Sequence, residues 1–149
     1  MKVAIACDHG GFELKGEVIK LLESLGHEVA DLGAHQYDAE DDYPDYARYV
    51  GQAIQHHQAQ RGILICGSGV GACVTANKIK GVRAGLCHDT YSAGQCVEHD
   101  DVNVLCLGAR IVGTALAAEL VKAFVNARFT KEARHVRRLE KVNAIEAGG

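Results

Sequence analysis

The segment at residues 62–78, GILICGSGVGACVTANK, constrains the fold more than any other part of the sequence. It opens with an uninterrupted apolar run that ends at Cys66, a pattern typical of a strand buried on both faces of a parallel sheet. Glycines then stand at alternate positions, Gly67, Gly69 and Gly71, and a segment able to form a helix follows. Such a strand, turn and helix leave backbone N–H groups unpaired where the helix dipole is positive. The segment therefore predicts an anion-binding site.

Two polar side chains stand at the start of this turn. Cys66 ends the expected strand, and Ser68 lies two positions further on. A positively polarised turn favours the thiolate form of a thiol at its rim, which makes Cys66 a candidate base or nucleophile. The alternative is that Cys66 is a small buried hydrophobic residue, as most free cysteines are. The residues alone leave both interpretations open.

Length and composition narrow the class of protein. The chain has 149 residues, which suits a single domain with a full core, and its net charge of −3 gives no reason to expect a nucleic acid or an anionic membrane as partner. No apolar run approaches the ~20 residues of a membrane span, so we expect a cytoplasmic protein. The six cysteines form no Cys-x-x-Cys pair, which favours reduced thiols over disulfides or a zinc site.

Strand-like and helix-like segments alternate along the chain. The predicted strands lie at residues 2–7, 28–32, 62–66, 83–87 and 102–107, and the predicted helices at residues 12–25, 46–60, 71–80, 91–99 and 113–127. Residues 33–45 are predicted to form a polar acidic loop. The alternation predicts a five-stranded parallel sheet with right-handed crossovers and helices on both faces, in one domain spanning residues 1–149.

A further helix is predicted at about residues 131–147, after the sheet is complete. Its apolar stripe is narrow, and Arg134 and Arg138 share a face one turn apart. Such charges usually do no more than keep a helix face solvated. An appended helix packs on its own domain or on a second subunit. We expect the second arrangement, because a homodimer is the commonest assembly for a small domain.

Ligands of an open α/β sheet bind beyond the carboxyl ends of the strands. This rule brings together residues 8–9, 66–71, 88–89 and 108–110 at one edge. Asp8 serves equally well there as the N-cap of the first helix or as a ligand contact. His9 stays open between a ligand contact and an exposed polar residue. His99 ends a helix instead of a strand, so a neighbouring subunit is expected to bring it to the site.

Two known glycine-loop motifs match this segment poorly. A Gly-x-Gly turn with Asp89 about 20 residues later resembles part of a dinucleotide-binding fingerprint. However, the third glycine comes one position early, and the chain has no room for a catalytic domain. A cysteine phosphatase loop would need an arginine where Ala72 stands. The dinucleotide signal is therefore weak, and the phosphatase interpretation is excluded.

Several motifs, taken together, resemble one family over essentially the whole chain. They are CDHGGF at residues 7–12, DYP at 42–44, ICGSGVG at 65–71, ANK at 76–78, HDDVNVL at 99–105, GAR at 108–110 and the arginine–histidine tail. This is the pattern of the B-type ribose-5-phosphate isomerases, a family that also includes allose-6-phosphate and galactose-6-phosphate isomerases. The resemblance implies a three-layer α/β/α Rossmann-like sandwich that needs no metal or cofactor. It also implies sites built across a homodimer interface, with pairing of dimers into a tetramer left open.

The resemblance implies a role for each matching residue. Cys66 would take the proton from C2 of the aldose, Ser68 would move protons between the two oxygens, and His99 would open the sugar ring. The remaining residues would hold the substrate. The backbone of Gly67, Ser68, Gly69, Val70 and Gly71 would hold the enediolate, Asp8, Tyr43 and Arg110 would line the sugar, and His9, Arg134 and Arg138 would grip the phosphate.

The implied reaction interconverts D-ribose 5-phosphate and D-ribulose 5-phosphate. One departure from the family is Asp100, where asparagine is common, because a carboxylate cannot donate a hydrogen bond to an oxyanion. A second is Arg137, an additional arginine in the tail. Two alternatives therefore remain: an isomerase of a six-carbon sugar phosphate, and a non-catalytic protein that binds a sugar phosphate or a nucleotide. The cysteine and histidine halves of the site are both in this chain, which favours a self-sufficient homo-oligomer.

Overall fold

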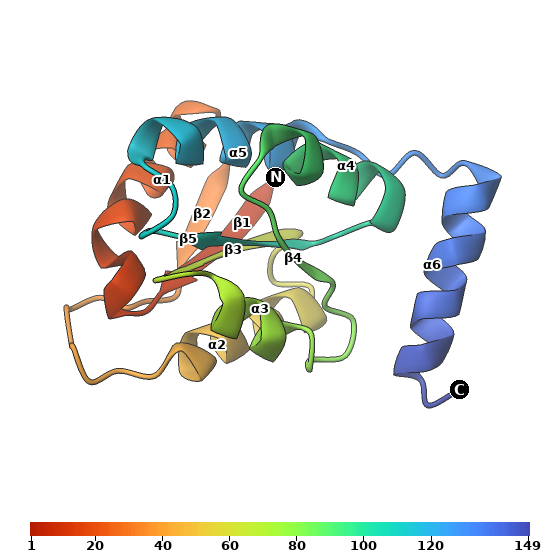
Figure 1. Ribbon diagram of the computed structural model, residues 1–149, viewed down its shortest axis with the longest axis horizontal. Coiled ribbons are helices and arrows are strands. Elements are labelled where there is room, and N and C mark those ends of the chain that lie inside the picture. The colour runs from red at the N-terminus through yellow and green to blue at the C-terminus, as the bar shows by residue number, and fades with distance from the viewer.

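The computed structural model describes residues 1–149 and has five parallel strands in the order β2-β1-β3-β5-β4. The strands are β1 (Lys2–Cys7), β2 (Glu28–Asp31), β3 (Arg61–Cys66), β4 (Ala84–Leu86) and β5 (Val104–Gly108). The helices are η1 (His9–Gly11), α1 (Phe12–Ser24), α2 (Tyr43–Gln55), α3 (Val70–Ala76), α4 (Thr90–Asp100), α5 (Thr114–Asn126) and α6 (Ala133–Glu146). Helices α1, α4 and α5 cover one face of the sheet, and α2 and α3 cover the other (Figure 1).

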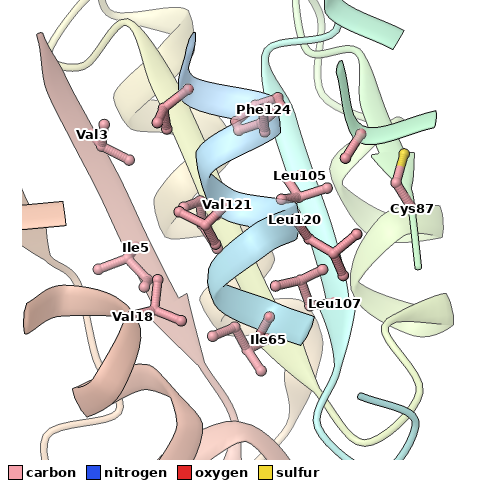
Figure 2. Close-up of a cluster of buried hydrophobic side chains, with 14 of the residues drawn as sticks. Val3, Ile5, Val18, Ile65, Cys87, Leu105, Leu107, Leu120, Val121 and Phe124 are labelled. Atoms are coloured by element: carbon pink, nitrogen blue, oxygen red, sulfur yellow. The ribbon is translucent and has the colours of Figure 1, made fainter. Parts of the chain in front are cut away.

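Two hydrophobic clusters form the core, one on each face of the sheet. In the larger cluster, Val3 and Ile5 of β1 lie on the same side as Leu120 and Phe124 of α5 (Figure 2). The intervening Ala4 belongs to the second cluster, because successive side chains of a strand point to opposite faces. Strands β3 and β5 are buried along their whole length, which explains their uninterrupted apolar runs.

The strands and principal helices follow one another as predicted, and the predicted fold class is confirmed. It is a three-layer α/β/α Rossmann-like sandwich with an additional C-terminal helix. The boundaries of α2 were predicted wrongly. The helix begins at Tyr43, within the predicted acidic loop, and ends at Gln55. Pro44 lies in its first turn, where the missing N–H would have no helical partner in any case.

Helix α6 lies beside α4 and stands apart from the sheet (Figure 1). Its side chains Val142 and Ile145 are 52% and 73% exposed, so this chain alone leaves the apolar stripe of the tail uncovered. The expectation that a second subunit covers the stripe stays a prediction. None of the helices has the length and apolar character needed to cross a bilayer.

Candidate active site

The glycine turn after β3 holds the Cys66 thiol in place. The thiol is buried, and its Sγ accepts the backbone N–H of Gly69 at 3.1 Å. Gly69 has a φ of 82°. A Cβ at this position would lie 2.6 Å from Cδ1 of Leu86, so both conformation and space require glycine. The Oγ of Ser68 accepts the N–H of Val70 at 3.2 Å. The turn therefore directs polar groups of Cys66 and Ser68 to the start of α3.

A cavity of about 410 Å³ opens above this turn. It collects residues from the carboxyl ends of β1, β3 and β5 and from the start of α2. The lining residues are Asp8, His9, Gly10, Tyr43, Cys66, Gly67, Ser68, Gly71, Arg110 and Ile111. The structure thus brings together most residues that were expected at this edge. A larger hollow of about 930 Å³ shares His9, Gly10 and Arg110 with it.

Tyr43, at the start of α2, and Arg110, just after β5, both lie close to the glycine turn. A Cβ added to Gly71 would come within 2.6 Å of the Tyr43 ring, so the ring packs directly on the turn. A Cβ added to Gly67 would lie 3.7 Å from Cδ and Nε of the Arg110 side chain. The backbone N–H of Arg110 donates to Gly67 O at 3.0 Å. Tyr43 supplies an aromatic side and Arg110 a cationic side to the cavity.

Asp8 is both a cap and a wall of the cavity. Its side chain is buried, and Oδ1 accepts the N–H of Gly10 at 2.9 Å, which caps the short turn η1. Burial raises the pKa of the Asp8 carboxyl, and the Gly10 hydrogen bond acts in the opposite direction. The N-cap of α1 itself is Gly11, so the prediction that Asp8 caps the first helix is wrong; Asp8 caps the short turn before that helix and also lines the cavity.

His9 is paired with Asp41, a residue that sequence reasoning missed. His9 Nδ1 lies 2.6 Å from Asp41 Oδ1, and the Asp41 side chain is only 7% exposed. The hydrogen bond to Asp41 raises the pKa of His9, which favours a cationic ring at the cavity. Residues 33–45 were predicted only to form a polar acidic loop, and no local pattern distinguishes Asp41 from its acidic neighbours. Only the folded loop places it against η1.

One cluster of side chains has metal-ligand geometry. Single ligand atoms of Asp8, His9 and Asp41 lie within 4.8 Å of one another. The hydrogen bond between His9 Nδ1 and Asp41 Oδ1 accounts for the closeness of these two residues without an ion.

The predicted ring-opening and tail residues lie elsewhere in the chain. Helix α4 runs antiparallel to the strands, so His99 and Asp100 lie near the amino end of β5, away from Cys66. Neither they nor Arg134 and Arg138 line the Cys66 cavity. His99 instead packs on His135 of α6, with ring centroids 4.1 Å apart. One chain therefore carries two separate groups of candidate residues.

Comparison with known proteins identifies the family. A family model described as ribose/galactose isomerase matches residues 3–142. The chain belongs to the ribose/galactose isomerase family. It is 43% identical to ribose-5-phosphate isomerase B of Escherichia coli, over 97% of this chain and 96% of that protein. The predicted family and the predicted class of enzyme, an isomerase, are thus confirmed.

Solved structures of this family match the fold closely. Ribose-5-phosphate isomerase B of Clostridium thermocellum superposes with a TM-score of 0.95 at 41% identity and covers 99% of both chains. The enzyme of Mycoplasma genitalium, solved with bound ribulose 5-phosphate, superposes with a TM-score of 0.93 at 40% identity. That match covers 99% of this family member and 97% of the other chain.

Proposed function

We propose that this protein interconverts D-ribose 5-phosphate and D-ribulose 5-phosphate through a cis-enediolate, with Cys66 as the base. The observation that carries the proposal is the buried Cys66 thiol on a glycine turn, facing a cavity that is also lined by His9 and Arg110. Relatives named ribose-5-phosphate isomerase B, one of them solved with ribulose 5-phosphate, support the choice of a five-carbon sugar phosphate.

The chemistry begins with the open-chain aldose. The Cys66 thiolate takes the proton from C2, the C–H electron pair forms the C1–C2 double bond, and the carbonyl electrons move to O1. Backbone N–H groups of the turn stabilise the charge that builds on oxygen. The Ser68 hydroxyl carries a proton from O2 to O1, and the Cys66 thiol returns its proton to C1. The steps balance without a metal or a cofactor.

The substrate phosphate needs positive charge, and the chain offers it in two places. His9 is at the cavity, with its pKa raised by Asp41. Arg134 and Arg138 are exposed on α6 and lie outside the Cys66 cavity. A phosphate dianion bound by all three requires the tail of a second copy, because guanidinium groups bind phosphate through direct hydrogen bonds.

A homodimer would complete the site. Exposed apolar residues on β4 and on the segments that follow β3, β4 and β5 are Val70 and Val74 of α3, Leu86 at the end of β4, Tyr91 of α4 and Ile111. Exposed apolar side chains of this kind favour protein–protein contact. A partner seated there would bring its own His99 toward Cys66, where it would open the sugar ring.

The test measures turnover of ribose 5-phosphate and allose 6-phosphate in chelator-treated buffer. Wild type should convert ribose 5-phosphate, and Cys66→Ala should lower kcat by about 10²–10⁴-fold, the usual contribution of a general base. Cys73→Ala is the matched control, because the thiol of Cys106 hydrogen-bonds to Cys73 and lowers its pKa to about 7. Preference for allose 6-phosphate would transfer the proposal to six-carbon substrates. Full activity of Cys66→Ala would contradict the role of the base.

A further inference from the structure

His135 is the only buried residue of α6 and is 1% exposed. Its Nδ1 lies 2.6 Å from Thr130 Oγ1, and the backbone N–H of Thr130 donates to Glu98 O at 3.0 Å. These contacts tie the start of the tail to the last turn of α4. The Nε2 of His135 is buried and has no hydrogen-bond partner. An apolar ring would fill the same space without this unpaired nitrogen, so burial alone does not explain a histidine here.

The His135 ring covers one face of the His99 ring. The two centroids are 4.1 Å apart and the planes are inclined by 25°, which is a stacked arrangement. Gln95, one helical turn before His99, places its Nε2 at 2.9 Å from His99 Nδ1. Stacking fixes the plane of the His99 ring, and the amide fixes its rotation within that plane. The His99 Nε2 is then the nitrogen left for a substrate.

The amide also selects the proton position on His99. An amide N–H₂ can only donate, so the Nδ1 of His99 accepts, and the neutral ring carries its proton on Nε2. Burial lowers the pKa of His135, as do the neighbouring His99, Arg134 and Arg138, while Glu132 acts in the opposite direction. The neutral form of the His135 ring is thus favoured beneath His99.

We propose that His135 and Gln95 are positioning residues for ring opening: His135 fixes the plane of the His99 ring, and Gln95 keeps its Nε2 protonated. The inference rests on the proposed function, in which His99 opens the furanose. Ring opening requires a proton donor at the ring oxygen, and the Nε2–H form of His99 is such a donor. A tail residue outside the Cys66 cavity thus prepares the group that acts before Cys66.

Two assays separate ring opening from the enediolate step. Turnover of ribose 5-phosphate, which is cyclic, needs both steps. Ribulose 5-phosphate is open-chain because its C5 hydroxyl carries the phosphate, so exchange of its C1 proton with deuterated solvent needs only the enediolate step. His135→Ala and Gln95→Leu should lower kcat on ribose 5-phosphate by about 10–100-fold, the usual cost of a displaced catalytic group. Exchange at C1, followed by proton NMR, should stay within about twofold of wild type.

Milder variants and controls complete the experiment. Thr130→Val removes only the hydroxyl that holds His135, and His135→Phe keeps a ring under His99, so both should lose less activity than His135→Ala. The ¹⁵N shifts of His99 should lose the Nε2–H signature in Gln95→Leu. His56→Ala, an exposed histidine remote from both sites, should behave as wild type.

Each other outcome contradicts one specific claim. Equal loss of turnover and exchange in His135→Ala and Thr130→Val would show a purely structural role and overturn the inference, as would unchanged turnover in all variants. A wild type that neither converts ribose 5-phosphate nor exchanges the C1 proton would instead overturn the proposed function. If Gln95→Leu matched wild type in both C1 proton exchange and turnover, only the positioning role of Gln95 would be rejected.

Discussion

His9 Nδ1 lies 2.6 Å from Asp41 Oδ1, and the same oxygen accepts the backbone N–H of His9 at 3.1 Å. One carboxylate therefore fixes both the backbone and the ring of His9. The pair brings the loop before α2 against the turn after β1, although 32 residues separate the two partners. It also raises the pKa of His9, which favours the cationic ring near neutral pH.

Asp41→Asn should lower the pKa of His9 and weaken binding of the sugar phosphate by about tenfold, which is about 1.4 kcal/mol. NMR titration of the His9 ring and the Kd for ribose 5-phosphate at pH 7.5 would measure both effects. Asp38→Asn is the control, because Asp38 Oδ1 only accepts the N–H of Glu40 in an exposed turn. An unchanged pKa of His9 would refute the charge pairing.

The same variant makes a prediction about pH and stability. The folded pKa of His9 is raised, so the pair stabilises the fold fully below the unfolded pKa of about 6.5 and loses this effect as pH rises through the folded pKa. The difference in Tm between wild type and Asp41→Asn should therefore be larger at pH 5.5 than at pH 9. A difference that grows with pH would contradict this assignment.

Gly71→Ala tests the contact between the turn and Tyr43. The added methyl group would lie 2.6–2.8 Å from three carbons of the Tyr43 ring, so the ring must move. We expect KM for ribose 5-phosphate to rise by about tenfold through loss of the aromatic wall, equivalent to about 1.4 kcal/mol. The matched control is Gly16→Ala on α1, where a Cβ meets nothing within 4 Å. Gly16→Ala should stabilise the fold by about 0.5–1 kcal/mol. An unchanged KM in Gly71→Ala would contradict the role of the Tyr43 ring as a wall of the cavity.

The order of residues within a short segment predicts those strands and turns that depend only on the burial and backbone conformation of that segment. The apolar run before Cys66 and the glycines after it specify a buried strand and a tight turn by themselves, because burial and backbone conformation are imposed residue by residue. Alternation of strands and helices then places Asp8 and Cys66 at one edge of the sheet, and both line the cavity.

Long-range pairing is what the sequence could not provide. Asp41 looks like any residue of a solvated acidic loop until the loop folds onto His9. From the sequence, His135 is indistinguishable from the exposed residues of a charged tail, yet it is the one residue of α6 that is buried. In the sheet, β5 lies between β3 and β4, and no periodicity in the sequence predicts this order of strands. Each of these features arises from contacts between segments whose own patterns are compatible with several arrangements.

Arg134→Ala combined with Arg138→Ala tests the phosphate grip of the tail. Both side chains are exposed on α6, and the only ion pair there joins Arg134 to Glu132 at 3.3 Å. Their removal should cost little stability, since exposed pairs contribute about 0–1 kcal/mol, but should weaken binding of ribose 5-phosphate by about 10²-fold or more. Isothermal titration gives the affinity. Arg137→Ala, which removes the third arginine of α6, is the comparison, and equal losses in both variants would indicate a general charge effect.

The separation of Cys66 and His99 within one chain leads to a complementation experiment. If each site takes Cys66 from one subunit and His99 from its partner, Cys66→Ala and His99→Asn homodimers both lack complete sites. A mixed dimer of the two variants has one intact site and one that lacks both groups. Random pairing makes half of the dimers mixed, so co-expression should restore about a quarter of wild-type turnover of ribose 5-phosphate. Differently tagged chains allow the mixed dimer to be purified, and it should then reach about half of wild type. No recovery in the purified mixed dimer would place His99 and Cys66 of the same chain in one site and reject the shared interface.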